Sequence, residues 1–176
     1  MERNILNPRI IEERSFTLVG MSFYGDPFNL HGGWDEENQI GLLWKRFFAF
    51  LSQSPDLAFL LAEKHSYEVH IYTPETIAKG LFEVFVGLDL DISRLTEIPA
   101  ELLIKHLPAC QYAVFTFQGE EISADWEKLL SGWMQDSDFE SAGAYNFQYY
   151  DARFKGLDRL AESMLDVYVP IKKKSA

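Results

Sequence analysis

The stretch LPACQYAVFTFQG, residues 107–119, indicates how the chain folds. Its β-branched and aromatic side chains are typical of a strand, and Gly119 marks the point where that strand ends. A comparable run, SFTLVGM, stands in the first half of the chain at residues 15–21. Two such strands, one in each half, suggest that the chain contains an internal duplication.

Each of these strands is followed by an amphipathic segment. Residues 39–53 and 123–135 carry apolar side chains at spacings of three and four, which places them on one face of a helix. The spacing is the same in both stripes, which consist of Ile40, Leu43, Trp44 and Phe47 in the first half and Trp126, Leu129, Leu130 and Trp133 in the second. The matching stripes support the duplication.

Two further strands follow each helix. They are expected at residues 66–73 and 81–91 in the first half and at residues 144–153 and 165–172 in the second. Each half therefore has the order strand, helix, strand, strand, with one repeat over about 8–92 and the other over about 100–173. Because either unit alone would bury too little apolar surface, we predict one α+β domain over residues 1–176.

Composition excludes several classes of protein and site. The net charge of −11 over 176 residues opposes direct binding to nucleic acid, and no apolar run approaches the roughly 20 residues of a membrane helix. A single cysteine, Cys110, excludes an intramolecular disulfide and a cysteine-based zinc site. No metal-ligand spacing is formed by the histidines, which are His31, His65, His70 and His106. We expect a cytoplasmic protein without a metal or cofactor.

Several motifs, in their order along the chain, resemble the GyrI-like small-molecule-binding domain, the effector-binding module of AraC-type and MerR-type multidrug regulators. Besides residues 107–119, the motifs are RIIEERSFTLVGM (9–21), IGLLW (40–44), FVGLDL (85–90), WMQDSDFE (133–140), FQYYD (147–151) and DVYVPIK (166–172). The resemblance implies a curved antiparallel sheet with helices packed on it. It also implies a groove between the two halves that holds aromatic, often cationic, ligands.

Strand alternation and the resemblance together suggest which side chains reach this groove. The candidates are Trp44, Phe48, Phe85, Asp89, Phe117, Gln148, Tyr150 and Tyr168. The family commonly has Glu at the position of Gln148, and an amide offers hydrogen bonds without charge. A preference for cations would therefore require another carboxylate, and Asp89 is the candidate.

Three functions stay open. The first is a sensor or sequestering protein for a small aromatic molecule, acting without a DNA-binding segment of its own. The second is a hydrolase of electrophilic small molecules, with Asp89 or Glu83 as general acid or base beside Tyr150 or Tyr168. The third is a protein-binding inhibitor, like the gyrase-inhibitory members of the family, whose acidic surface engages a basic partner.

Overall fold

The structure is a computed structural model that describes residues 7–29, 36–62, 65–89, 91–94 and 97–175. Its strands are β1 (Arg9–Gly25), β2 (Ser66–Ile71), β3 (Phe82–Asp89), β4 (Leu103–Gln118), β5 (Phe139–Ser141), β6 (Tyr145–Tyr150) and β7 (Met164–Lys173). Its helices are α1 (Gln39–Gln53), α2 (Pro74–Lys79) and α3 (Trp126–Asp136), with 3₁₀ turns η1 (Pro55–Ala62), η2 (Ile92–Arg94), η3 (Gly119–Ser123) and η4 (Leu157–Glu162). The predicted α+β class is confirmed.

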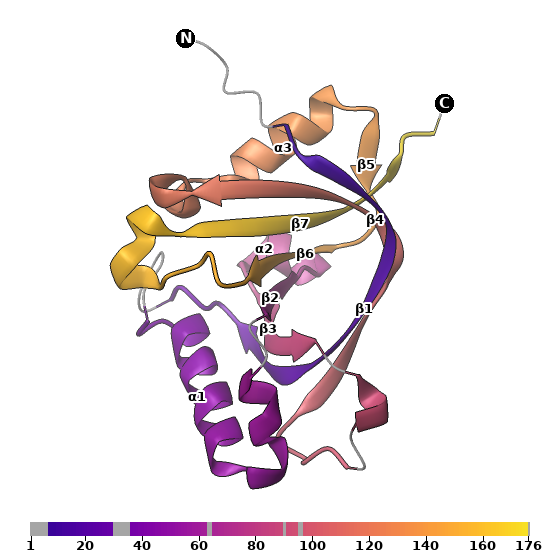
Figure 1. Ribbon diagram of the computed structural model, residues 1–176. Coiled ribbons are helices and arrows are strands. Elements are labelled where there is room, and N and C mark those ends of the chain that lie inside the picture. The colour runs from indigo at the N-terminus through magenta and orange to yellow at the C-terminus, as the bar shows by residue number, and fades with distance from the viewer. Residues whose placement is uncertain (1–6, 30–35, 63–64, 90, 95–96, 176) are drawn as a thin grey trace.

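The strands form one antiparallel sheet that closes on itself. Their order is β4-β1-β3-β2-β6-β7-β5, and an additional pairing of β4 with β7 joins six of the seven strands into a ring. The halves meet twice, where β2 pairs with β6 and where β1 pairs with β4. Figure 1 shows the two longest strands, β1 and β4, curving together along one side of the molecule.

The Pro-Ala-Cys corner of β4 lies just before the point where β7 joins this strand. Residues 103–114 of β4 pair with β1, and residues 111–118 pair with β7, so residues 112–114 have both neighbours. The β1 register shifts on both sides of the pair Arg14 and Cys110, so the ladder is irregular at this point. A bulge bends a strand, and Pro108 has no N–H to give to a ladder. The corner is therefore suited to bending β4 where its pairing with β7 begins.

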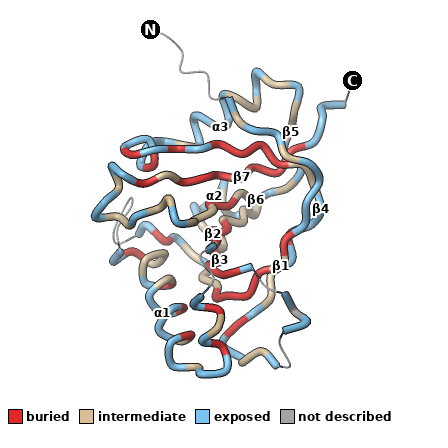
Figure 2. Tube along the Cα trace, viewed as in Figure 1, coloured by how far each residue is buried: buried red, intermediate tan, exposed pale blue. Residues whose placement is uncertain are grey.

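The strands bury side chains on both faces. The inner face of the ring is aromatic, and Phe147 and Tyr168 stack there with ring centroids 4.6 Å apart. On the outer face, α1 packs on β1 and β3 through residues such as Phe47, while α3 packs on β4 and β7. Figure 2 shows the buried residues concentrated along the strands. The outer face of β2 and β6 therefore lies between α1 and α3 and is covered by neither helix.

Candidate functional site

A cavity of about 1830 Å³ lies between α1 and α3, over β2 and β6. This is the junction of the two halves of the chain. Typical small-molecule sites measure roughly 300–1,000 Å³, so this one admits a bulky ligand or a long one. Short helix α2 and the loop before α3 contribute to its rim.

The side of the cavity formed by α1 is aromatic. Trp44 and Phe48 lie one turn apart and stack at 5.5 Å with an interplanar angle of 16°. The rings of Trp44 and Tyr150, which belongs to β6, make an edge-to-face contact with their centroids 5.9 Å apart. Across the cavity, α3 contributes Trp126 and Met134. Flat aromatic surfaces of this kind suit aromatic ligands and attract cations over their faces.

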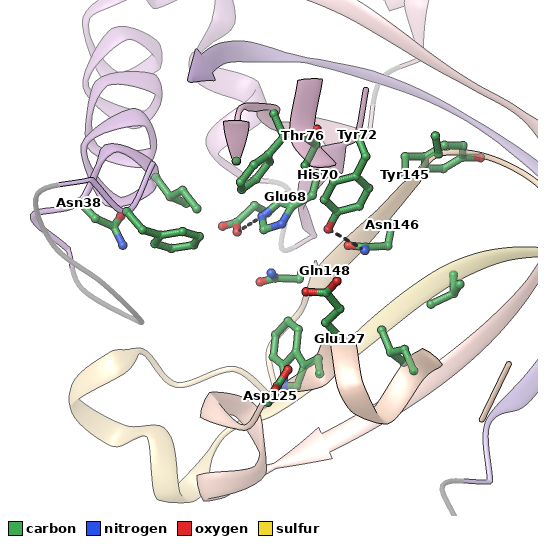
Figure 3. Close-up of a pocket in the computed structure, with 18 of the residues that line it drawn as sticks. Asn38, Glu68, His70, Tyr72, Thr76, Asp125, Glu127, Tyr145, Asn146 and Gln148 are labelled. Carbon is green, nitrogen blue, oxygen red and sulfur yellow. Dashed lines mark hydrogen bonds and ion pairs between the residues drawn. The ribbon is translucent and has the colours of Figure 1, made fainter. Parts of the chain in front are cut away.

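Glu68 is the buried acid of the cavity. It belongs to β2 and is only 5% exposed. Its Oε2 accepts a hydrogen bond of 2.8 Å from Trp44 Nε1, and its Oε1 lies 2.9 Å from His70 Nε2, as Figure 3 shows for the second contact. A buried carboxylate needs such partners to offset its lost hydration. Trp44 and His70 therefore hold Glu68 in one orientation.

Gln148 lies directly opposite Glu68 in the pairing of β6 with β2. It is 4% exposed, and its Oε1 accepts a short hydrogen bond from the Tyr150 hydroxyl. The same hydroxyl lies 3.4 Å from Glu68 Oε2. Burial, followed by the charge of Glu68, raises the pKa of Tyr150 well above its ordinary value. Tyr150 consequently stays a neutral hydrogen-bond donor beside the carboxylate.

The charged residues of the cavity are predominantly acidic. Its one lysine, Lys45, lies 3.4 Å from Glu36 at the rim, and among the described residues no arginine lines the cavity. The remaining carboxylates are Glu68, Asp125 and Glu127. The lining therefore carries net negative charge, which favours cations.

Four of the predicted site residues line the cavity: Trp44, Phe48, Gln148 and Tyr150. Four do not. Phe85 and Tyr168 belong to the aromatic cluster inside the ring. Asp89 is an exposed residue at the end of β3, and Phe117 is 1% exposed beneath Trp126, with which it stacks at 5.3 Å.

The pairing of β2 with β3 explains the position of Phe85. Glu68 lies opposite Val86, and His70 opposite Val84, so the even-numbered residues of β3 share the outer face with the cavity. From the sequence, Phe85 and Asp89 are expected to face the ligand, but these odd-numbered residues belong to the other face of β3. On β7, Val167 lies opposite Gln148 and Tyr168 opposite Phe147, which turns Tyr168 into the ring.

The residues suggested for hydrolysis are not brought together. Tyr150 lines the cavity, whereas Asp89 and Tyr168 do not. Glu83 is engaged elsewhere, because its Oε1 accepts 2.7 Å hydrogen bonds from Lys105 Nζ and from the Ser22 hydroxyl.

Sequence reasoning missed Glu68, His70 and Glu127. A signal for the first two was present in SYEVHIYT, where Glu68 and His70 alternate with Tyr67 and Val69. Alternation of this type separates a polar face from an apolar one. Two ionisable residues on one face of a central strand therefore indicate that this face lines a binding site.

The structure gives no sign of a membrane span or a metal centre within the described residues. None of the helices described there combines the length and the apolar character needed to cross a bilayer. Nor do His, Cys, Asp and Glu side chains in that part of the chain form a group of three or more that could hold a metal ion. His31, one of the four histidines, lies outside the described residues.

Comparisons with known proteins agree with this architecture. The model of the Cass2 family, described as integron-associated effector binding protein, matches residues 9–171. The transcriptional regulator BrlR of Pseudomonas aeruginosa is 28% identical over 169 residues, which are 94% of this chain and 56% of the regulator. The chain thus spans little more than half of that relative's length.

Two solved structures share the fold over almost their whole length. SAV2435 bound to tetraphenylphosphonium has a TM-score of 0.61 at 15% identity, covering 95% of this chain and 94% of its own. The integron cassette protein Cass2 from the mobile metagenome of Vibrio cholerae has a TM-score of 0.57 at 17% identity, covering 97% of this chain and 100% of its own. The resemblance to the GyrI-like domain is confirmed, and the chain belongs to the Cass2 family of integron-associated effector-binding proteins.

Proposed function

We propose that this protein captures small lipophilic aromatic cations in the cavity and acts as a sensor or sequestering protein for them. The observation that carries the proposal is Glu68, a buried carboxylate placed among the aromatic side chains of Trp44 and Tyr150. An aromatic cation gives up hydration when it enters such a cavity. A fixed carboxylate and the faces of aromatic rings offset that loss.

Glu68 also bears on the charge preference that Gln148 put in question. The family position that commonly carries a carboxylate holds an amide in this chain, but the residue opposite it on β2 is Glu68. The charge needed for a cation is therefore present one strand away, and Asp89 is not required. The tetraphenylphosphonium bound by SAV2435, a protein of the same fold, supports this ligand class.

Calorimetric titration with tetraphenylphosphonium tests the proposal, with triphenylphosphine oxide as a neutral aromatic comparison. We expect the wild-type protein to prefer the cation. Glu68→Gln removes the charge and keeps the shape, and it should weaken cation binding on the order of tenfold to a hundredfold, as for loss of a buried charge partner. Binding of the neutral compound should change little.

The matched control is Glu120→Gln, the same chemical change at an exposed residue of η3 outside the cavity lining. It should leave both affinities unchanged. Equal cation affinity in wild type and Glu68→Gln, or no binding of the cation by the wild type, would contradict the proposal.

A further inference from the structure

The cavity contains a second carboxylate whose role the binding of a single charge does not explain. Glu127 lies in the first turn of α3 and lines the cavity. Figure 3 shows it reaching in from α3, on the side away from Glu68 and His70. Within the described residues its carboxylate has no hydrogen bond or ion pair.

The other acids of the lining already have partners. Glu36 lies 3.4 Å from Lys45, and the Oδ1 of Asp125 accepts a hydrogen bond from the backbone N–H of Lys128 as the cap of α3. Glu68 is held by the N–H groups of Trp44 and His70, but it has no lysine or arginine partner among the described residues. Glu68 is the buried acid of the lining, and Glu127 is the one without a hydrogen bond or ion pair among the described residues, so these two are the candidates for cationic groups of a ligand.

These two carboxylates act on the same space. Tyr72 also lines the cavity, and its hydroxyl accepts a 3.0 Å hydrogen bond from Asn146 Nδ2. Burial raises the pKa of Tyr72, and the negative charges of Glu127 and Glu68 raise it further. Both charges therefore reach the same enclosed hydroxyl, although they come from opposite halves of the chain.

A single cationic group contacts one of these carboxylates and leaves the other without a counter-charge. The volume of about 1830 Å³ is more than one compact ligand requires. We propose that the cavity is selective for elongated dicationic aromatic ligands, with one charge at Glu68 and the other at Glu127. This inference rests on the proposed function, because it assigns a ligand class to the same cavity.

The test compares tetraphenylphosphonium with polymethylene bis(triphenylphosphonium) ions of increasing linker length, titrated calorimetrically into the whole protein. Linking two cations makes the second contact intramolecular, so affinity should pass through a maximum at the linker that spans both carboxylates. At that length we expect the dication to bind at least about tenfold more tightly than the monocation.

The variant Glu127→Gln separates the contribution of Glu127 to binding from that of Glu68. It should weaken the best dication about fivefold, the scale of an exposed ion pair, and weaken tetraphenylphosphonium by a clearly smaller factor, because the monocation contacts Glu68 alone. Glu68→Gln should weaken both ligands. Glu120→Gln serves again as the control outside the cavity, and circular dichroism verifies that each variant is folded.

The outcomes distinguish this inference from the proposed function. If tetraphenylphosphonium binds through Glu68 but no dication binds more tightly, or if Glu127→Gln weakens both ligands equally, dication selectivity is overturned and the cation site stands. If neither ligand binds the wild-type protein, both proposals fail.

Discussion

At the scale of single residues, the buried negative charge of the cavity is carried on β2. Glu68 and Gln148 are opposite each other in the ladder, and side chains in such positions have Cβ atoms about 4.5–5.5 Å apart. A carboxylate at either of these two positions would therefore lie beside Tyr150. Trp44 and His70 fix the position actually used.

We predict that exchanging the two groups preserves cation binding. The double variant Glu68→Gln/Gln148→Glu should bind tetraphenylphosphonium within about threefold of the wild-type affinity, while Glu68→Gln alone stays weak. Gln148→Glu alone places two carboxylates side by side, which raises the pKa of the pair. Calorimetry on all three variants measures this. A double variant as weak as Glu68→Gln would show that the position of the charge, and not only its presence, matters.

At the scale of elements, β1 and β3 approach each other at a pair of glycines. Gly20 lies opposite Gly87, and a Cβ added to Gly20 would meet the carbonyl oxygen of Val86 at 1.9 Å. A Cβ on Gly87 would meet the carbonyl oxygen of Val19 at 2.4 Å. Because the obstacles are backbone atoms, they cannot rotate away. The close contact of these strands therefore depends on the missing side chains.

Gly20→Ala should lower the free energy of unfolding by about 3 kcal/mol or more, because the strands must separate to admit the methyl group. The matched control is Gly132→Ala in α3, where an added Cβ has no neighbour within 4 Å. That change should stabilise the protein by about 0.5–1 kcal/mol through helix propensity. Urea denaturation of both variants measures these changes in the free energy of unfolding. Two changes of the same sign would contradict the prediction.

At the scale of the whole molecule, folding buries several tyrosines, some inside the ring and others in the cavity. Burial is the largest cause of a raised pKa in Tyr67, Tyr72, Tyr112, Tyr145, Tyr149, Tyr150 and Tyr168. For Tyr145, whose hydroxyl lies 2.8 Å from that of Tyr112, the pKa rises to about 12. The folded chain thus keeps these hydroxyls neutral where the unfolded chain would ionise them.

We predict a loss of stability at high pH. A tyrosine whose pKa is higher in the folded state contributes stability that is complete below its unfolded pKa of about 10 and is lost as pH rises through the folded pKa. The free energy of unfolding should therefore fall steadily above about pH 10. Phenolate absorbance and far-ultraviolet circular dichroism should change together. Ionisation of several tyrosines at that pH without loss of secondary structure would contradict the prediction.

Much of the fold was predictable because it depends on local periodicity. The apolar stripe of residues 39–53 coincides with α1, and the alternation in β6 correctly separates Gln148 and Tyr150 from Phe147 and Tyr149. Trp44 and Phe48 could likewise be placed on one helix face. These assignments need only the spacing of neighbours along one element.

The sequence by itself determined the class of fold and the family, because these follow from periodicity and from motifs within single segments. Tertiary structure decided which face of each strand meets the helices. Alternation sorts side chains into two sets but does not say which set points outward, since that depends on pairing with other strands and on closure of the ring. For this reason Phe85 and Tyr168 lie inside the ring, and Glu68 is the acid of the cavity.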